Sequence, residues 1–205
     1  MPNILEMSVT KKESFTNFLN ECWIFPPSEI TKLDPKFLNL WSKQIAAKIE
    51  DLSHGHMLPY SVEQAQSDLL SGLAMVLTTP NQQEILSYIK KSAWPNHIGT
   101  ACWEVGSIFT DPLVQNMGVG KHMLKTFSES QNFAASREPV IAVVTDTNLP
   151  SLHIFRSQKW LELHPEAQET GKFLHYDING ANIYEDWGYS SSIFFHPQLL
   201  VKNLK

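Results

Sequence analysis

The sequence predicts a mixed α/β fold, in a single domain that spans residues 1–205. Three observations predict it. The first third has helical periodicity, three strand-like runs follow one another, and helices then alternate with strands up to a hairpin signal. A chain of 205 residues is long enough to bury a substantial core. We divide it into a helical N-terminal extension, residues 1–60, and a core, residues 61–195.

The N-terminal extension shows apolar residues at helical spacing. A first short face contains Phe15, Phe18, Leu19 and Cys22. Asp34-Pro35 then supplies a capping residue and a proline at the first helical position, ahead of a four-residue repeat that runs through Phe37, Trp41, Ile45 and Ile49. Ser61, followed by Gln64 three residues later, has the form of a capping box and predicts a helix to about Leu70.

Strand-like runs begin at Leu73. Residues 73–79, 84–91 and 100–110 are separated by turn-forming residues and predict an antiparallel meander. A helix is expected from about Met117 to Phe133, and residues 139–146 form a continuous apolar run, typical of a strand covered on both faces. A short helix at 149–159 follows, and Asn179-Gly180 predicts a final hairpin.

Composition excludes several classes of protein. A net charge of −5 offers no basic footprint for nucleic acid, although mild acidity could attract a cationic amine. No apolar run reaches the roughly 18 residues of a membrane span, and the N-terminus lacks the pattern of a secretory signal. Two cysteines far apart argue against a disulfide framework and suit a reducing, cytoplasmic location.

Other reactive residue types point to no metal or thiol chemistry. His54 and His56 are spaced like a metal pair, but no third ligand is evident, so we expect no metal. Cys102 is better explained as a small buried strand residue than as a nucleophile.

The stretch "QNMGVGK", residues 115–121, follows a strand and opens a helix. It lacks the third glycine of a dinucleotide fingerprint, and His122 stands where a Walker A loop needs Ser or Thr. Backbone amides at such a helix start would favour an anion, and side chains at Gly118 and Gly120 would obstruct its approach. Alternatively, the glycines make a tight turn and let the helix pack closely on the sheet.

Two segments resemble the GNAT superfamily of acyl-CoA-dependent N-acyltransferases. Gln115-x-x-Gly118-x-Gly120 is similar to its pyrophosphate-binding motif. The pattern of Asn148, Ser151, Ile154 and Phe155 is similar to a second segment of the family, one helix and one strand later. The resemblance covers about residues 62–195. It implies a mostly antiparallel sheet with one splayed parallel strand pair and helices on both faces.

Three positions depart from the family pattern. Lys159 stands where the family usually has glycine and Trp160 where it has Phe, which predicts an altered turn into the following strand. Phe155 replaces a tyrosine that in many members protonates the departing thiolate, and a phenyl ring has no proton to give.

The resemblance implies acetyl-CoA as co-substrate. Its pantetheine arm would lie along Ile108, Phe109 and Thr110 like an added strand. Its diphosphate would sit on the amides of the loop, and further contacts would come from the start of the next helix. The full implied cofactor set is Ile108, Phe109, Thr110, Gln115, Asn116, Met117, Gly118, Val119, Gly120, Lys121, Asn148, Ser151 and Phe155.

Glu104 is the candidate general base, because several family members carry their catalytic glutamate at this place in the strand. A carboxylate between apolar neighbours in a partly dry cleft would have a raised pKa. Strand alternation would put Cys102, Glu104, Gly106 and Ile108 on one face. The alternative is a solvated or ion-paired surface glutamate. For the proton returned to the thiolate, His153, Tyr184, Tyr189 and water all stay open.

Two functions remain open at this point. The first is an acetyl-CoA-dependent N-acetyltransferase acting on a small primary amine or a protein amino group. The second is a degenerate acyl-CoA-binding sensor or interaction module. The cluster of Tyr184, Glu185, Asp186, Trp187 and Tyr189 could select an amine or could be a solvated edge strand. A homodimer is compatible with the sequence, which does not determine the oligomeric state.

Overall fold

The structure is a computed structural model that describes residues 17–30, 32–53, 60–94, 102–136, 138–163 and 191–197. Residues 17–21 are helical. The later helices are α2 (Pro27–Ile30), α3 (Pro35–Ser53), α4 (Val62–Leu70), α5 (Val119–Ser130) and α6 (Leu149–Ser157), with 3-10 turns η2 (Pro112–Val114) and η3 (Phe133–Ala135). The strands are β1 (Trp23–Phe25), β2 (Ala74–Thr78), β3 (Ile85–Trp94), β4 (Cys102–Thr110), β5 (Val140–Thr145), β6 (Leu161–Leu163) and β7 (Ser191–Phe195).

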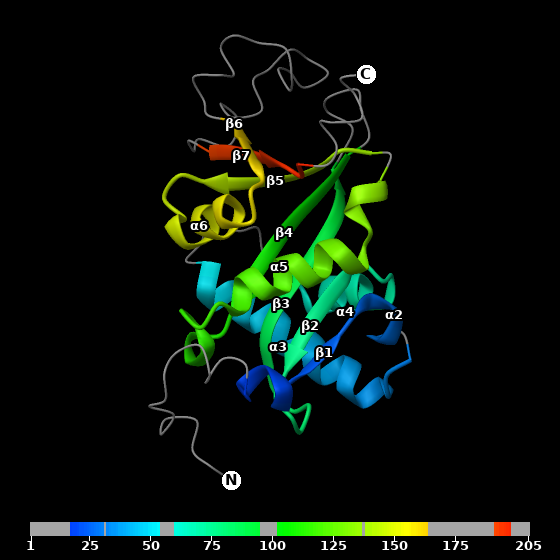
Figure 1. The fold of residues 1–205 in the computed structure, drawn as a ribbon. Coiled ribbons are helices and arrows are strands. Elements are labelled where there is room, and N and C mark those ends of the chain that lie inside the picture. Colours follow the sequence, from blue (N-terminus) through cyan, green and yellow to red (C-terminus); the bar gives the residue numbers. More distant parts are fainter. Residues whose placement is uncertain are drawn as a thin grey trace. The chain divides into compact units, whose positions relative to one another are not determined.

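The strands form one seven-stranded sheet in the order β1-β2-β3-β4-β5-β7-β6 (Figure 1). Strand pairs β1–β2, β2–β3, β5–β7 and β6–β7 are antiparallel, and β4–β5 is parallel. The parallel ladder pairs Trp103 with Val140 and Glu104 with Ile141, and it continues no further among the described residues. The expected fold class, a mostly antiparallel mixed sheet with one parallel pair that splays, is therefore confirmed.

Contacts between Cα atoms divide the chain into two compact units. The first unit contains residues 1–90 and 107–123, and the second contains residues 91–106 and 124–205. Strands β3 and β4 and helix α5 each contribute residues to both units.

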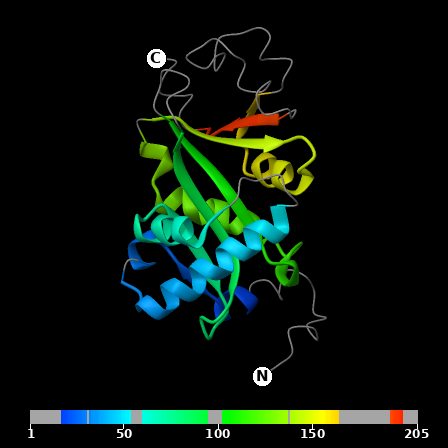
Figure 2. The same cartoon turned by 180° about the vertical axis from the view of Figure 1, so that it is seen from behind.

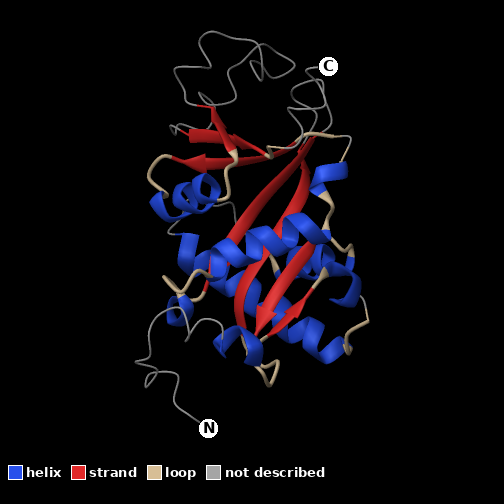
Figure 3. Ribbon diagram, viewed as in Figure 1, coloured by secondary structure: helices blue, strands red, loops and turns tan. Residues whose placement is uncertain are grey.

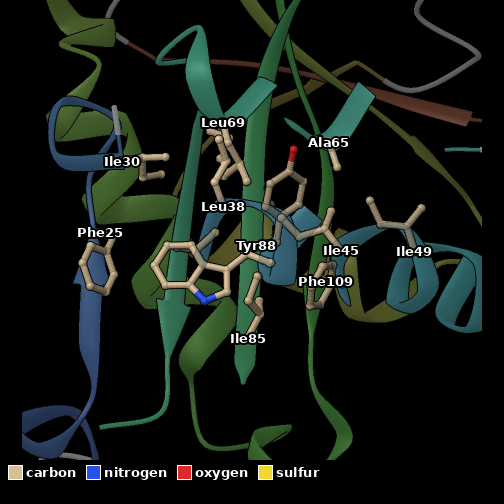
Figure 4. Packing of buried hydrophobic residues seen from close by; sticks show 13 residues of the cluster. Phe25, Ile30, Leu38, Ile45, Ile49, Ala65, Leu69, Ile85, Tyr88 and Phe109 are labelled. Carbon is tan, nitrogen blue, oxygen red and sulfur yellow. The ribbon is translucent and has the colours of Figure 1, made fainter. Parts of the chain in front are cut away.

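The core of the first unit lies between its strands and the pair α3 and α4. Both helices lie in front of the strands in Figure 2 and behind them in Figure 1, so they cover one face. Three residues of the expected four-residue repeat of α3 are buried, since Trp41 and Ile45 are 0% and Ile49 is 2% exposed, and Phe37 is half-buried. These residues pack with apolar side chains of β1, β3 and β4, among them Phe25, Ile85, Tyr88 and Phe109 (Figure 4).

The starts of α3 and α4 agree with their predicted caps, with one difference. Asp34 accepts a hydrogen bond from the N–H of Lys36 at 2.9 Å, and Ser61 accepts one from the N–H of Gln64 at 3.1 Å. The Gln64 side chain does not complete the capping box. Its amide donates instead to Asp68 at 3.0 Å, because that buried carboxylate needs donors.

Asp68 belongs to a buried polar group that joins α4 to β3. Its carboxylate accepts from the Tyr60 hydroxyl and binds Lys90 Nζ at 2.8 Å, and the hydroxyls of Tyr60 and Tyr88 lie 2.9 Å apart. Burial above all raises the pKa of both tyrosines, so both hydroxyls stay protonated. The two charged residues of this group, Asp68 and Lys90, are paired with each other, as buried charges require.

The second unit contains helix α6 and the strands β5, β6 and β7 (Figure 3), and aromatic side chains pack together there. The ring of Phe155 lies 5.0 Å from Trp160 and 5.2 Å from Phe194, measured between ring centroids. Trp160 also contacts His196, whose pKa is lowered by burial. Lys91 Nζ lies 4.6 Å above the Trp103 ring, and burial lowers the pKa of this lysine too.

Several element boundaries differ from the expectation. Helix α5 ends at Ser130, and residues 133–135 form a separate 3-10 turn after Asn132, which has a left-handed φ of 49°. Strand β1 and helix α2 were not predicted, because residues 23–30 are too short for a periodic pattern. The predicted hairpin at Asn179-Gly180 lies outside the described residues. No helix in the described part of the chain has the length and apolar character to cross a membrane.

Candidate functional site

The segment between β4 and α5 begins with a turn that Asp111 closes. Asp111 is 9% exposed and caps the 3-10 turn η2, where its carboxylate accepts from the N–H of Leu113 at 3.0 Å. Its own N–H donates to the carbonyl of Leu86 in β3 at 2.8 Å, and its carbonyl accepts from Val114 at 2.9 Å. Both the side chain and the backbone of Asp111 thus form hydrogen bonds, so the chain leaves the sheet in a defined direction.

The two glycines of the loop have different roles. Gly118 has φ 89°, in the region where a side chain is strained, so the backbone conformation itself requires glycine. Gly120 is not in that region. It lies buried in the first turn of α5. Asn116 is also left-handed, with φ 61°, a conformation that asparagine tolerates better than most residues.

The loop has a row of peptide N–H groups for which the described part of the chain provides no partner. Among the described residues, the N–H groups of residues 116–121 have no hydrogen-bond acceptor, and the first to find one belongs to His122, which donates to Gly118 at 3.0 Å. The first turn of α5 contains no acidic side chain, and Lys121 is exposed there. Unpaired N–H groups and the positive end of a helix dipole together favour an anion.

Gln115 closes the loop rather than extending it. Its side-chain amide donates to the carbonyl of Thr110 at 3.0 Å, which joins the loop to the last residue of β4. Its N–H donates to Pro112 at 3.4 Å. The side chain of Gln115 therefore contributes to the shape of the loop, and the backbone of the following residues is what remains available.

The end of β4 is held from the β3 side. Phe109 is 6% exposed and stacks on Tyr88 at 5.8 Å, and its carbonyl accepts from the buried Ser87 hydroxyl at 2.7 Å. Ile108 and Thr110 are half-buried. Ser107 has a left-handed φ of 52°, which interrupts the expected alternation between Gly106 and Ile108 and is the kind of irregularity that a β-bulge introduces.

Glu104 lies half-buried in β4. A Cβ placed on Gly106 would lie 3.7 Å from the Glu104 carboxylate oxygen Oε1. The two residues thus share a face, as strand alternation predicted, and the carboxylate leans over the glycine at ordinary contact distance. The role of Glu104 as a base stays a prediction.

At the start of α6, the motif residues have roles inside the protein. Asn148 is the N-cap, and its side-chain oxygen accepts from the N–H of Ser151 at 3.2 Å. Phe155 is 2% exposed in the aromatic core, whereas His153 is exposed. Lys159 has φ 59°, so it adopts the left-handed conformation for which the glycine of the family pattern is suited.

Several other predictions fall outside the described residues. These are the aromatic and acidic cluster of Tyr184, Glu185, Asp186, Trp187 and Tyr189, the pair His54 and His56, and the side chain of Cys102. Within the described part of the chain, no group of three or more His, Cys, Asp or Glu residues could hold a metal ion.

One ion pair near the loop was not predicted from the sequence. Lys48 of α3 binds the Asp111 carboxylate, with side-chain exposures of 26% and 12%. The Asp-Pro pair at 111–112 was a visible signal for a capping aspartate. Nothing local indicated its partner, which lies 63 residues earlier in the chain.

Comparisons of sequence identify no relative of the chain. No protein-family model matches it, and no curated protein sequence does either.

Comparisons of structure do find similar chains. A putative acetyltransferase, YncA from Salmonella typhimurium with acetyl-CoA, has a TM-score of 0.56 and 12% identity over 88% of this chain and 95% of that one. An acetyltransferase of the GNAT family from Staphylococcus aureus has a TM-score of 0.54 and 8% identity, covering 86% and 99% of the two chains. A chain of the NatC complex bound to Gag peptide and CoA has a TM-score of 0.53 and 14% identity, covering 85% and 98%.

At such identities the likeness is one of fold. The mostly antiparallel seven-stranded sheet with its one parallel pair, β4–β5, agrees with it. The chain has the GNAT fold.

Proposed function

We propose that the protein is an N-acetyltransferase that transfers the acetyl group of acetyl-CoA to a primary amine of a small molecule or a protein. The observation that carries the proposal is the row of N–H groups at residues 116–121, which have no acceptor among the residues that the structure describes. The left-handed Gly118 and the closing contact of Gln115 present this row at the start of α5. A diphosphate is an anion of the right size for such a row. The structurally similar YncA and NatC chains were solved with acetyl-CoA or CoA.

In this proposal the N–H groups of Asn116 to Lys121 bind the diphosphate, and the backbone at Ile108 to Thr110 orients the pantetheine arm as an added strand would. The thioester supplies an activated acetyl group. Asn148, Ser151 and Phe155, at α6, complete the proposed cofactor contacts. The Phe155 ring is packed in the core of the second unit, so it would contact the cofactor from that packed position.

Glu104 is the proposed base. An ammonium has no lone pair, so the acceptor nitrogen must lose a proton before it attacks the carbonyl carbon. Glu104 would take that proton on the same strand whose end leads into the loop. As the C–S bond breaks, the thiolate takes a proton from water or from a nearby acid. His153 is exposed, and an imidazole is a side chain that can donate a proton, whereas the phenyl ring of Phe155 cannot.

The test combines binding and turnover. Thermal stabilisation by acetyl-CoA should reach about 2.7 kcal/mol at one hundred times its Kd, and free thiol should appear when acetyl-CoA is mixed with amines from a panel of free peptide N-termini, lysine peptides and polyamines. Absence of any stabilisation by acetyl-CoA or CoA would contradict the proposal outright.

The Glu104→Gln variant tests the base. We expect kcat to fall by about 10²- to 10⁴-fold with an unchanged Kd for acetyl-CoA, because the amide keeps the shape and loses the basic oxygen. Glu84→Gln is the matched control, since Glu84 is exposed at the start of β3. Unchanged turnover of Glu104→Gln at every pH would show that another group removes the proton.

The second candidate is an acyl-CoA-binding module without turnover. The observation that favours it is the buried Phe155, which lacks the hydroxyl of the tyrosine in the family pattern. Stabilisation by acetyl-CoA without thiol release for any amine of the panel would favour this candidate.

A further inference from the structure

Asp111 connects three separate parts of the first unit. One oxygen of its carboxylate caps η2 through Leu113, and the other binds Lys48. Its N–H is bonded to Leu86 of β3. The nearly buried Asp111 is therefore one of the residues that fix the path of the chain from the end of β4 to the loop at residues 115–121.

Helix α3 reaches the same end of the sheet with two polar side chains one turn apart. The Gln44 side chain accepts from the N–H of Ile85 at 2.8 Å and donates to the carbonyl of Gln83 at 2.6 Å. Lys48, four residues later, reaches Asp111. Between and beside them, Trp41, Ile45 and Ile49 are fully or almost fully buried, so the helix is a fixed support for both contacts.

From these contacts we infer that Lys48 is a positioning residue for coenzyme A: through Asp111 it holds the glycine loop in the conformation that presents its N–H groups to the diphosphate. The inference rests on the proposed function and adds to it a residue outside the resemblance. Lys48 itself need not touch the cofactor, since its ammonium is already engaged by Asp111.

The charges give the ion pair a second consequence. Asp111 is 12% exposed at its side chain and precedes the proposed anion site by only a few residues. Paired with Lys48, its negative charge is balanced. Without the lysine, the Asp111 carboxylate would be unpaired and mostly buried. It would then either move to a more solvated position and displace the turn, or stay in place and repel the diphosphate.

The experiment measures the affinity of the full chain for coenzyme A by calorimetry, in wild type, Lys48→Met, Lys48→Arg, Asp111→Asn and the double variant Lys48→Met/Asp111→Asn. Lys43→Met is the matched control, because Lys43 lies on the same helix, is exposed, and loses the same charge. Asp111→Asn retains an oxygen to cap η2, so it removes the charge and leaves the cap. Circular dichroism confirms that each variant is folded.

We expect Lys48→Met to weaken coenzyme A binding by about tenfold or more, Lys48→Arg to restore most of the affinity, and Lys43→Met to bind like wild type. The double variant should bind no more weakly than Lys48→Met alone, because the pair is already broken. The loss should appear with 3′-phosphoadenosine 5′-diphosphate and not with pantetheine. In turnover assays it should raise the KM for acetyl-CoA and leave kcat unchanged.

Wild-type affinity in Lys48→Met, or equal losses for the nucleotide and pantetheine fragments, would overturn the positioning role while the proposed function stands. Additive losses in the double variant would overturn it too. If wild type itself binds no coenzyme A, the proposed function falls and this inference with it. Should Lys48→Met not fold, Asp111→Asn decides the question by the same fragment comparison, because it also breaks the ion pair.

Discussion

The glycine loop at residues 115–121 and the start of α6 at residues 148–155 resemble the same family, and they use their polar groups differently. In the loop, six consecutive N–H groups have no acceptor among the described residues. At α6, the Asn148 side chain caps its own helix and the Phe155 ring fills a core. The loop thus has hydrogen-bond donors that the described part of the chain does not use. The residues of α6 are already accounted for by helix capping and packing.

This difference shows when a short sequence motif is evidence for a ligand site. Asparagine three residues before a serine is a common way to begin a helix, so the second motif has an ordinary structural explanation. A left-handed glycine that exposes a helix N-terminus also shapes the backbone, but it leaves unsatisfied donors behind. Unsatisfied donors point to a ligand, and satisfied ones do not.

The largest effect is expected at Phe155. Replacing it with Ala should lower the free energy of unfolding by about 3–5 kcal/mol, because its ring is 2% exposed between Trp160 and Phe194. Urea unfolding measures this loss. Phe155→Leu, which keeps much of the volume, should cost far less. If Phe155→Ala instead kept its stability and lost acetyl-CoA affinity, the ring would belong to the cofactor site and the contrast between the two segments would disappear.

An intermediate effect is expected at Gly118. Gly118→Ala places a Cβ on a backbone with φ 89°, at a cost of about 1–2 kcal/mol, and the relaxed loop should lose coenzyme A affinity. Gly72→Ala is the matched control, because Gly72 is also left-handed, with φ 71°, after α4. Both variants should lose similar stability in urea, and only Gly118→Ala should bind coenzyme A more weakly. Equal affinities would mean that the loop conformation serves folding alone.

The smallest effect is expected at Lys159. Its φ of 59° is strained for a residue with a Cβ, so Lys159→Gly should raise the free energy of unfolding by about 0.5–1 kcal/mol. Lys159→Ala removes the same charge and keeps the Cβ, and it should give no such gain. Thermal and urea unfolding measure both. If Lys159→Ala also raised the free energy of unfolding, the effect would come from the lost charge and not from the left-handed backbone conformation.

Local patterns predicted much of the fold. The four-residue repeat at Trp41, Ile45 and Ile49 placed α3 and its buried face, and Asp34-Pro35 placed its start. The apolar run at 139–146 corresponds to β5, whose residues are buried or half-buried. Strand β1 and helix α2 were beyond such reasoning, because three or four residues are stabilised by their neighbours and not by a pattern of their own.

Some features of the candidate site could likewise be predicted from the sequence, and others could not. The sequence indicated an anion-binding helix start at residues 115–121 and a glutamate on the preceding strand. It did not reveal that Gln115 binds the carbonyl of Thr110, since a side-chain amide has many candidate partners. For the same reason it predicted a complete capping box at Ser61, where the structure sends the Gln64 side chain to Asp68.

By itself, then, the sequence determined what depends on neighbouring residues: periodicity, caps, the conformation that glycine permits at position 118, and through these the mixed α/β fold. Only the tertiary structure decided which polar groups find one another. It paired Lys48 with Asp111 across 63 residues, buried Phe155 among other rings, and left the N–H groups of the loop without acceptors in the described chain. The physical reason is that a hydrogen bond or ion pair requires two groups to meet in space, and for residues far apart in the chain only folding brings this about.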